Sequence, residues 1–567
     1  MSRAEQSLRD IDAIVIGSGM TGGLAAKELT ERGLRVLLLE AGRPVDPERD
    51  AREHVAPFEM KFRGLGNRRY VESRQRVQRN SVTFDELSHQ YWTDDVDHPF
   101  STPGDKPFDW FRARQLGGKS LIWGRQVYRM SDLDFEANVR EGVGVDWPIR
   151  YRDIAPWYDH VERFIGISGQ HEGIAHLPDG IFQPPMALNV VEQHVRDRMA
   201  ARFGRERVLT IGRVAILTAP RPGRAVCHYC GPCHRLCSTR SYFSSINASI
   251  PAAQATGRLT LRTHSIVRSI AYDPSTRRVT GVHVIDARTG ADRTYTARLV
   301  FLCASAIESA RILLNSRGPG YENGLANSSD QVGRNIMDHV KAPGTSGTIE
   351  GFGDRKTIGN RPNGIYVPRF RNIGSARADY LRGFGFQGGA SRSGWQALAR
   401  SAGLGAAFKE RLAAPGPWSM AFNGYGECLP NERNRATIHP TLTDKWGIPS
   451  LHIDAAWGEN ELTMHKDIPV AAAELLEAAG ARDIQLPNRP PAPMGNANHE
   501  MGTARMGRDA RTSVLNGWNQ AWDALNLFVT DGSAMTSSGC QNPSITYMAL
   551  TARACAHAVA ELKRRNL

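Results

Sequence analysis

"IDAIVIGSGMTGGLAAKELTERGLRVLLLE", residues 11–40, carries the pattern that decides the fold. The mostly apolar run 11–16 is typical of a buried strand, and it passes directly into the glycine-rich turn GSGMTG. A helical pattern with apolar residues on one side follows, and a second apolar run ends at Glu40. This order of strand, turn, helix and strand predicts a Rossmann-like unit that binds a dinucleotide.

Three glycines and one carboxylate have separate tasks in that unit. Gly17 allows the tight turn, Gly19 lets the backbone approach a pyrophosphate, and Gly22 lets the helix pack on the sheet. The N-terminus of the helix stabilises the phosphate charge. Glu40 lies at the distance along the chain expected for a carboxylate that binds a ribose hydroxyl. The motif alone is compatible with both NAD and FAD.

The composition is that of a large globular protein. At 567 residues, with 41% hydrophobic and 23% charged residues, the chain is long enough for several domains, and disorder throughout is excluded. No segment reaches the roughly 18 uninterrupted apolar residues of a membrane-spanning helix. The net charge of +13 comes from Lys and Arg scattered over the whole length, which disfavours nucleic-acid binding. The polar start MSRAEQSLRD is unlike a signal peptide and by itself predicts a cytoplasmic protein.

Half of the eight cysteines lie in one short stretch, CHYCGPCHRLC, residues 227–237. The spacing C-x2-C-x2-C-x3-C is that of the short run seen in bacterial ferredoxins, and it favours an iron–sulfur cluster. In that ferredoxin pattern the fourth cysteine serves another cluster, so a 3Fe-4S cluster is favoured over a 4Fe-4S cluster. A disulfide and a zinc site are the alternatives, although zinc sites usually separate their cysteine pairs by a longer insert. The candidate metal ligands are Cys227, Cys230, Cys233 and Cys237.

Six segments, in order along nearly the whole chain, resemble the glucose–methanol–choline (GMC) family of FAD oxidoreductases. They are GSGMTGG, RQLGGKSLIWG, CASAIESARILLNS, VGRNIMDH, HEMGTARMG and DGSAMTSSGCQNPSITYMAL. The resemblance implies an α/β fold with a Rossmann-like FAD-binding domain and a sheet-based substrate-binding domain. It also implies non-covalent FAD, because GGKSLIWG contains no His that could attach the flavin. The residues it assigns to the cofactor are Gly17, Gly19, Thr21, Gly22, Glu40, Arg114, Gly117, Gly118, Ser120, Trp123, Asp531, Gly532, Asn542 and Ser544.

Both domains are expected to be discontinuous in sequence. Alternating apolar and polar residues over 258–305 predict strands of one β-meander, and the Gly-, Ala- and Arg-rich stretch from about 380 to 416 is expected to be a loop or lid. The predicted FAD-binding domain comprises residues 1–45, 100–150, 250–340 and 495–567, and the predicted substrate-binding domain comprises 46–99, 151–249 and 341–494, including the cysteine segment 227–237.

The family places a His, followed some forty residues later by a His or Asn, at the face of the flavin. The matching residues here are His499 and Asn542. Oxidation of a secondary alcohol requires removal of the hydroxyl proton while hydride leaves carbon. A neutral imidazole, with an ordinary pKa of about 6.5, is a suitable proton acceptor, and Asn542 can stabilise charge on the alcohol oxygen. The alternatives are a structural histidine for His499 and a turn residue before Pro543 for Asn542.

An iron–sulfur centre beside a flavin passes electrons singly to an external acceptor, which predicts a dehydrogenase and not an oxidase. The combination resembles the catalytic subunits of bacterial sugar dehydrogenases, those of glucoside 3-dehydrogenases in particular. It implies oxidation of a sugar or glycoside at C3, a small subunit that carries an export signal, a cytochrome c acceptor and a periplasmic location. The alternatives are an oxygen-using sugar oxidase, similar to pyranose oxidase, with structural disulfides, and an electron-transfer or scaffold subunit.

Overall fold

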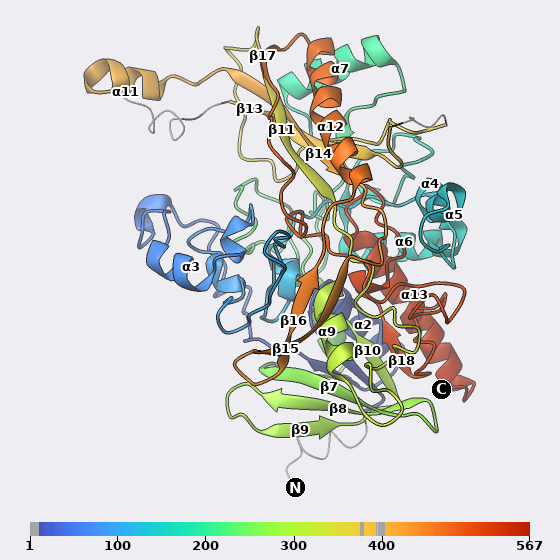
Figure 1. Cartoon of the computed structure of the whole chain (residues 1–567). Helices are drawn as coiled ribbons and strands as arrows, with labels where there is room; N and C mark the ends of the chain where they lie inside the picture. Colours follow the sequence, from blue (N-terminus) through green and yellow to red (C-terminus); the bar gives the residue numbers. More distant parts are fainter. Residues whose placement is uncertain (1–10, 375–378, 393, 395–402) are drawn as a thin grey trace.

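Two sheets organise the chain, as seen in a computed structural model that describes residues 11–374, 379–392, 394 and 403–567 (Figure 1). A parallel sheet of five strands lies in the lower half of Figure 1, and an antiparallel sheet of six strands lies in the upper half. Within the described ranges, no helix combines the length and the apolar character needed to cross a membrane. This arrangement confirms the predicted α/β class with a second, sheet-based part.

The parallel sheet is built from short apolar strands that lie far apart in sequence. Its first two strands read AIVI and VLLL and are buried along their whole length, as expected for strands covered on both faces. The crossover between them is helix α2, so the predicted strand–turn–helix–strand unit is confirmed. The spatial order is β18 (Leu527–Val529), β10 (Leu299–Leu302), β1 (Ala13–Ile16), β2 (Val36–Leu39) and β6 (Leu259–Arg262).

Helices cover this sheet and bring the C-terminus back to the glycine-rich turn. The C-terminal helix α13 packs against both α2 and α6, so the first and last parts of the chain share one core (Figure 1). The helices of this half are α2 (Met20–Glu31), α6 (Tyr151–Ile165), α8 (Ile250–Ala255), α9 (Ala306–Asn315) and α13 (Ser544–Lys563).

The meander predicted over 258–305 is correct only for its middle part. A separate three-stranded antiparallel sheet lies below the parallel sheet in Figure 1 and consists of β7 (Ser265–Asp273), β8 (Arg278–Asp286) and β9 (Asp292–Tyr295). The two ends of the stretch instead join the parallel sheet as β6 and β10. The physical reason is visible in β10, whose sequence LVFL is buried on both faces and does not alternate.

The antiparallel sheet forms the second half of the molecule. Helix α12 packs on β11 and β14, and α7 packs on α12. The order is β17 (Arg482–Gln485), β11 (Val340–Ile349), β14 (Trp418–Gly426), β13 (Phe384–Arg392), β12 (Ile365–Val367) and β5 (Thr210–Ile211). The two helices are α7 (Val190–Phe203) and α12 (Glu459–Ala478), and the β15 (Arg435–Thr443)–β16 (Pro449–Asp454) hairpin lies between the two halves in Figure 1.

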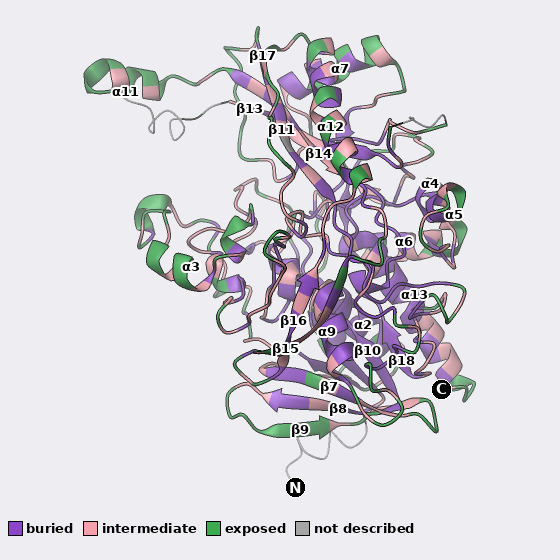
Figure 2. Ribbon diagram, in the orientation of Figure 1, coloured by how far each residue is buried: buried purple, intermediate pink, exposed green. Residues whose placement is uncertain are grey.

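The prediction of a loop or lid from about 380 to 416 is wrong for its first part. Residues 384–392 form β13, an interior strand of the antiparallel sheet. Its glycines hide the strand pattern because they allow close approach: a Cβ on Gly388 would lie 1.9 Å from the carbonyl oxygen of Ala421. Residues 405–413 form α11, an exposed helix that projects from the sheet in Figure 2. The part of the prediction that falls on 395–402 lies outside the described residues.

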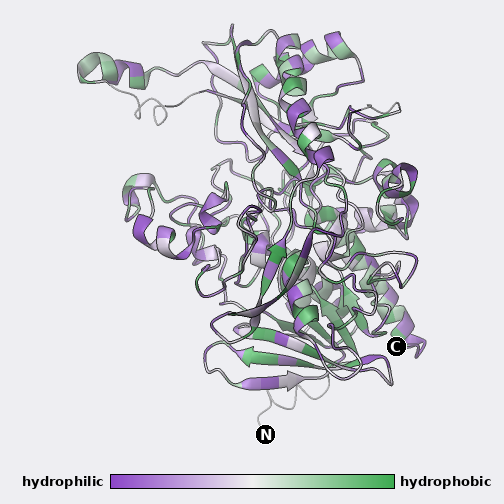
Figure 3. Cartoon of the chain, in the orientation of Figure 1, coloured by the Kyte–Doolittle hydropathy of each residue, from purple (hydrophilic) through white to green (hydrophobic). Residues whose placement is uncertain are grey.

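Burial and hydropathy follow the two sheets. Figure 2 shows the interior of both halves as buried, and Figure 3 shows the apolar residues gathered on the strands of the lower half and on the helices that cover them. The remaining helices and strands are short: α3 (Arg68–Arg74), α4 (Asp132–Phe135), α5 (Ala137–Glu141) and the β3 (Ile167–Ser168)–β4 (Phe182–Gln183) pair. The residue bounds predicted for the two domains stay a prediction.

Candidate active site

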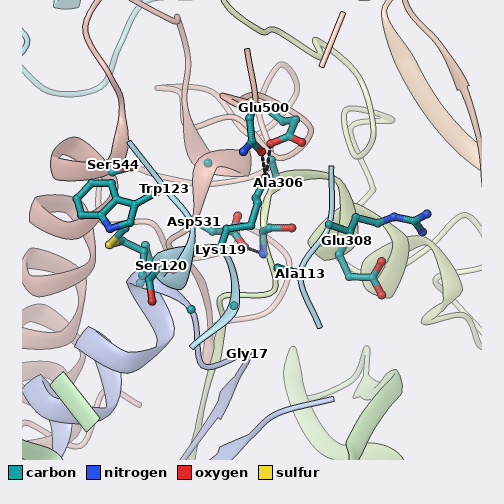
Figure 4. A pocket seen from close by; sticks show the side chains of 18 of the residues that line it. Gly17, Ala113, Lys119, Ser120, Trp123, Ala306, Glu308, Glu500, Asp531 and Ser544 are labelled. Atoms are coloured by element: carbon teal, nitrogen blue, oxygen red, sulfur yellow. Dashed lines mark hydrogen bonds and ion pairs between the residues drawn. The ribbon is translucent and has the colours of Figure 1, made fainter. Parts of the chain in front are cut away.

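A large cavity extends from the carboxyl ends of the parallel strands to the antiparallel sheet (Figure 4). This is where open α/β sheets bind nucleotides. Of the fourteen residues predicted to contact the cofactor, Gly22 and Gly117 do not line the cavity. The residues that do are Gly17, Gly19, Thr21, Glu40, Arg114, Gly118, Ser120, Trp123, Asp531, Gly532, Asn542 and Ser544.

The glycine turn leaves room for a phosphate at the start of α2. Gly17 has a φ of +94°, and a Cβ there would lie 2.5 Å from the carbonyl oxygen of Cys303. A Cβ on Gly22 would lie 1.8 Å from the oxygen of Gly17, so the helix can approach the turn only with glycine at this position. In contrast, a Cβ on Gly19 would meet no atom within 4 Å. Gly19 therefore borders open cavity space at a helix N-terminus, which fits a pyrophosphate.

Two buried carboxylates are held at the ends of strands that border the cavity. Glu40 accepts hydrogen bonds from the backbone N–H groups of Ser18 (3.2 Å) and Gly42 (2.8 Å). Asp531 accepts from the backbone N–H groups of Ser305 and Ser533, both at 3.0 Å. Burial raises the pKa of both carboxyl groups. Their positions suit contacts to ribose hydroxyls, which are the partners that an acidic residue at a strand end binds in dinucleotide sites.

Lys119 and Glu500 form an ion pair in the cavity wall. The Lys119 ammonium lies 2.6 Å from Glu500 Oε2, a contact marked by a dashed line in Figure 4. It also donates to Asn498 Oδ1 at 2.9 Å. Lys119 follows the glycine pair 117–118, and Glu500 follows His499 in sequence. The pair therefore connects the two loops between which the cofactor would lie.

His499 lies at the centre of a hydrogen-bonded chain of side chains. Its Nδ1 is 2.8 Å from Nδ1 of His339, whose Nε2 is 2.8 Å from the carbonyl oxygen of Gly539. A carbonyl oxygen only accepts, so His339 Nε2 carries a proton and its Nδ1 is the acceptor. His499 therefore donates from Nδ1 and keeps an unprotonated Nε2. Asn542 Nδ2 donates to that Nε2 at 3.1 Å.

Burial keeps this histidine pair neutral. It lowers the pKa of His499 well below the ordinary value, and the nearby charges of His339, Lys119 and Lys341 lower it further. Burial also lowers the pKa of His339 to about 4. Neutral rings are what the deduced proton positions require. The His499 imidazole is thus a neutral base whose Nε2 lone pair accepts from Asn542 at the cavity.

Asn542 is oriented from the antiparallel sheet. Gln387 of β13 donates from Nε2 to Asn542 Oδ1 at 2.5 Å, which leaves the Asn542 amide N–H groups facing His499. Asn542 directly precedes Pro543, the residue before α13. Its side chain thus bonds to groups distant in sequence, which favours the predicted site role over that of a turn residue.

Several residues that border His499 were missed by the sequence analysis. His339 ends the quoted segment VGRNIMDH, so its presence in a family motif was an available signal. Lys341, Gln387 and Tyr425 line the cavity from β11, β13 and β14. No signal in the sequence linked these strand residues to a loop more than seventy residues away.

The four predicted metal ligands lie near one another, outside the lining of the cavity. All eight cysteines of the chain are described, and all are free thiols. Cys227, Cys233 and Cys237 pack in one small apolar cluster with Tyr242. Burial raises the pKa of Cys230 to about 12, and the neighbouring Cys233 and Cys237 add to that shift. Burial also raises the pKa of Cys227, so both outer thiols, Cys227 and Cys230, favour the protonated form when no metal is bound.

Tyr242 connects this cysteine group to the loop around Gly117 and Gly118, which we call the cofactor loop. Its hydroxyl donates to the carbonyl oxygen of Leu121 at 2.9 Å, and Leu121 belongs to the short helix Gly118–Leu121 that lines the cavity. The guanidinium of Arg125 lies over the Tyr242 ring, 5.6 Å from its centroid. Arg125 is buried, and its Nε and Nη1 have no hydrogen-bond partner among the described residues. A buried, unpaired cation favours an anionic group nearby.

The spacing of the thiols fits a single metal ion poorly. A tetrahedral zinc ion holds each sulfur at about 2.3 Å, which brings the sulfurs within about 4 Å of one another. Across the described part of the chain, no three cysteine sulfurs lie within 4.8 Å of one another, and the one group of ligand atoms that does comprises Glu53, His54 and His228. In an iron–sulfur cluster the cysteines bind different iron atoms, and the cluster predicted from the cysteine spacing stays a prediction.

A dinucleotide cavity that holds a neutral imidazole base beside an amide defines an oxidoreductase acting on alcohols. Two GMC oxidoreductase family models, for the N-terminal and C-terminal parts, match residues 11–341 and 430–551. The chain therefore belongs to the GMC oxidoreductase family, whose members bind FAD. The predicted family and enzyme class are confirmed.

Relatives of known function and one solved structure extend over nearly the whole chain. A 2-methyl-1,2-propanediol dehydrogenase of Mycolicibacterium austroafricanum is 30% identical, covering 96% of this chain and 94% of the relative. A fructose dehydrogenase large subunit of Gluconobacter japonicus is 26% identical over 98% of both chains. The crystal structure of pyridoxine 4-oxidase from "Mesorbium loti" is 18% identical, with a TM-score of 0.59, and covers 96% of this chain and 99% of that chain. That structural likeness shows the shared fold.

Proposed function

We propose that this protein is an FAD-dependent dehydrogenase that oxidises a secondary hydroxyl, at C3, of a sugar or glycoside. The observation that carries the proposal is the unprotonated Nε2 of His499, which accepts a hydrogen bond from the amide of Asn542 in the cavity. FAD, when bound, supplies the hydride acceptor. The similarity to the fructose dehydrogenase large subunit supports the sugar class.

The residues of the chain account for the movement of the hydroxyl proton. An alcohol that enters between His499 and Asn542 replaces their mutual contact. Its O–H then donates to His499 Nε2, and the Asn542 amide N–H donates to its oxygen. The proton of His499 Nδ1 stays in its bond to His339, so the base accepts the new proton at Nε2 and becomes an imidazolium. The ion pair of Lys119 with Glu500 leaves no uncompensated charge at that wall.

The cysteine group supports a dehydrogenase with an iron–sulfur cluster, preferably 3Fe-4S, held by three or four of Cys227, Cys230, Cys233 and Cys237. When bound, such a cluster supplies one-electron transfer. Two features of the structure support it: the contact of Tyr242 with both the thiols and the cofactor loop, and the unpaired guanidinium of Arg125. We extend the proposal to a cytochrome c acceptor, a small subunit with an export signal, and a periplasmic location.

The reductive half-reaction, in which the substrate reduces the flavin in the absence of oxygen, tests the proposed function. The FAD-loaded enzyme is mixed with methyl glucosides, free sugars and their acid counterparts, gluconate and methyl glucuronide, and bleaching of the flavin absorbance is followed. We expect bleaching by at least one sugar, and a fall of about 10²- to 10⁴-fold in its rate in the His499→Asn variant with FAD still bound. A bound flavin that no sugar bleaches would support the electron-transfer or scaffold alternative.

A second measurement separates the dehydrogenase from the oxidase. Iron and acid-labile sulfide are quantified in protein purified without oxygen, and turnover is compared with dioxygen and with an artificial one-electron dye. The proposal predicts iron, sulfide and preferential dye reduction. Stoichiometric peroxide formation by iron-free protein would establish the oxidase alternative, although the free state of all eight thiols does not support its structural disulfides.

A further inference from the structure

Three neighbouring strands of the antiparallel sheet present polar side chains to the cavity beside His499. Lys341 of β11 is paired directly with Tyr425 of β14, and Tyr425 is paired with Gly385 of β13. Gln387 lies two residues beyond Gly385, on the same face of its strand. All three side chains line the cavity. They form one polar face, which we call the strand face, opposite the His499–Asn542 pair.

Lys341 is an unsatisfied cation on the strand face. Its side chain is half-buried, and its ammonium makes no hydrogen bond or ion pair within the described ranges. The other lysine of the cavity, Lys119, is already paired with Glu500 at 2.6 Å. A desolvated ammonium without a partner costs free energy unless a ligand supplies the counter-charge. Lys341 is therefore, like Arg125, a cavity cation that forms no ion pair with the described residues, and a substrate can supply its counter-charge.

The carboxylates that act on the charge of Lys341 form their hydrogen bonds with other groups. Asp338 and Asp109 favour the charged form of Lys341 from a distance. The two oxygens of Asp338 accept from the backbone N–H groups of His499 and Ala497, both at 3.1 Å. Those of Asp109 accept from the side chains of Asn80 and Asn496. Neither carboxylate forms an ion pair with the ammonium, so the protein itself leaves the close counter-ion position empty.

Tyr425 supplies a second donor next to the ammonium. Directly opposed residues on antiparallel strands have Cβ atoms about 5 Å apart, which brings the Tyr425 and Lys341 side chains to the same ligand. The Tyr425 ring centroid lies 6.2 Å from that of His499. Its hydroxyl makes no hydrogen bond in the described part of the chain. An ammonium and a phenol hydroxyl side by side can donate to the two oxygens of one carboxylate.

We propose that Lys341 and Tyr425 bind a carboxylate of the substrate, so that the substrate class is a sugar acid (an aldonic or uronic acid or its glycoside) and not a neutral sugar. The inference rests on the proposed function, which supplies the polyhydroxy substrate. Because Gln387 is hydrogen-bonded to Asn542, the strand face is fixed in position relative to the hydroxyl that reacts.

Binding without turnover tests this inference separately from the reaction. The FAD-loaded His499→Asn variant is titrated calorimetrically with two pairs of probes: gluconate and glucose, and methyl glucuronide and methyl glucoside. We expect at least one acid to bind about 10-fold or more tightly than its neutral counterpart, because a charge-assisted contact is added. Lys341→Met in the same background should remove that preference, and Lys341→Arg should retain part of it.

The control is Lys466→Met, which removes an exposed lysine of α12 and should leave the preference unchanged. Equal binding of acids and neutral sugars, or an acid preference that survives Lys341→Met, overturns the inference. Because no turnover is needed, these outcomes are independent of the proposed reaction. A wild-type enzyme whose flavin is bleached by neutral sugars as fast as by the acids would keep the proposed function and remove the sugar-acid class.

Discussion

His339 and His499 contact each other through their Nδ1 atoms at 2.8 Å, with ring planes 79° apart, and a single proton lies between them. The carbonyl oxygen of Gly539 decides which ring owns it, since it must receive the His339 Nε2 proton. The tautomer of the base is therefore set by a backbone group two bonds away in the hydrogen-bond chain. His339 is a positioning residue: it acts on the alcohol only through His499.

Replacing His339 by Asn should lower kcat without removing FAD. Because the Asn amide can present either its oxygen or its N–H to His499 Nδ1, the imidazole is no longer fixed in the tautomer with an unprotonated Nε2, and we expect a loss of roughly 10- to 100-fold in kcat with little change in KM. Stopped-flow flavin reduction measures the effect. His557→Asn, which alters a partly exposed histidine stacked on Trp518, is the matched control and should retain full activity. An unchanged kcat in His339→Asn would show that His499 does not depend on this contact.

The same pair predicts how stability depends on pH. The pKa of His339 is about 4 in the folded protein, because of burial, against about 6.5 in an unfolded chain. Between these values the unfolded state binds more protons, so stability is fully present above pH 6.5 and falls as the pH drops toward 4. Each such group contributes about 1.4 kcal/mol per pH unit in that window. The Tm of the holoenzyme, measured from pH 7.5 to 4.5, should fall accordingly.

His339→Asn gives the control for that pH dependence, because it removes one of the histidines whose pKa burial lowers. Its Tm should vary less steeply with pH between 6.5 and 4 than the Tm of the wild type. Parallel curves for the two proteins would mean that other groups, and not this pair, dominate the acid destabilisation.

Gln387 should matter for rate although it makes no contact with His499. Gln387→Leu removes the donor that holds the Asn542 carbonyl oxygen, so the amide can rotate and present oxygen in place of N–H to the substrate. We expect a decrease of about 10-fold in kcat/KM, because part of the molecules would lack the donor that stabilises charge on the alcohol oxygen. Gln193→Leu, on the exposed side of α7, serves as the control. Full activity in Gln387→Leu would show that a group other than Gln387 orients Asn542.

What the sequence could predict depended on how local the pattern is. The β1–α2–β2 unit was predictable because its strand run, turn glycines and helix lie within thirty residues, and His499 and Asn542 were predictable from family motifs. Lys341 and Gln387 were not, because their place beside His499 depends on how β11 and β13 lie against the loop 495–502. In β13 the glycines that permit close strand packing also remove the alternation by which a strand is recognised.

Loss of one thiol should lower the iron content of the protein without lowering its FAD content. Under the proposed iron–sulfur function, Cys230→Ser should lower bound iron and sulfide to a small fraction of the wild-type content while FAD stays bound, because no cysteine of the run lines the flavin cavity. Iron analysis and the visible absorbance of anaerobically purified protein measure this. Cys555→Ala, a buried position of α13 far from the run in sequence, should keep its iron. Iron-free wild-type protein would remove the cysteine run from metal binding, and equal iron content in both variants would leave Cys227, Cys233 and Cys237 as the ligands.

The two glycines of the turn should respond to the same added methyl group in opposite ways. Gly19→Ala places its Cβ in open cavity space, so the fold should persist with an unchanged Tm of the FAD-free protein, while FAD affinity falls. Gly22→Ala places its Cβ 1.8 Å from the Gly17 carbonyl oxygen, so the helix must move away from the turn, at a cost of about 1–3 kcal/mol or more for overpacking. Its Tm should drop even without FAD. Calorimetry of the stripped proteins and FAD titration give the two readouts. If Gly19→Ala binds FAD as tightly as the wild type, the open space at the start of α2 is not the place where the pyrophosphate lies.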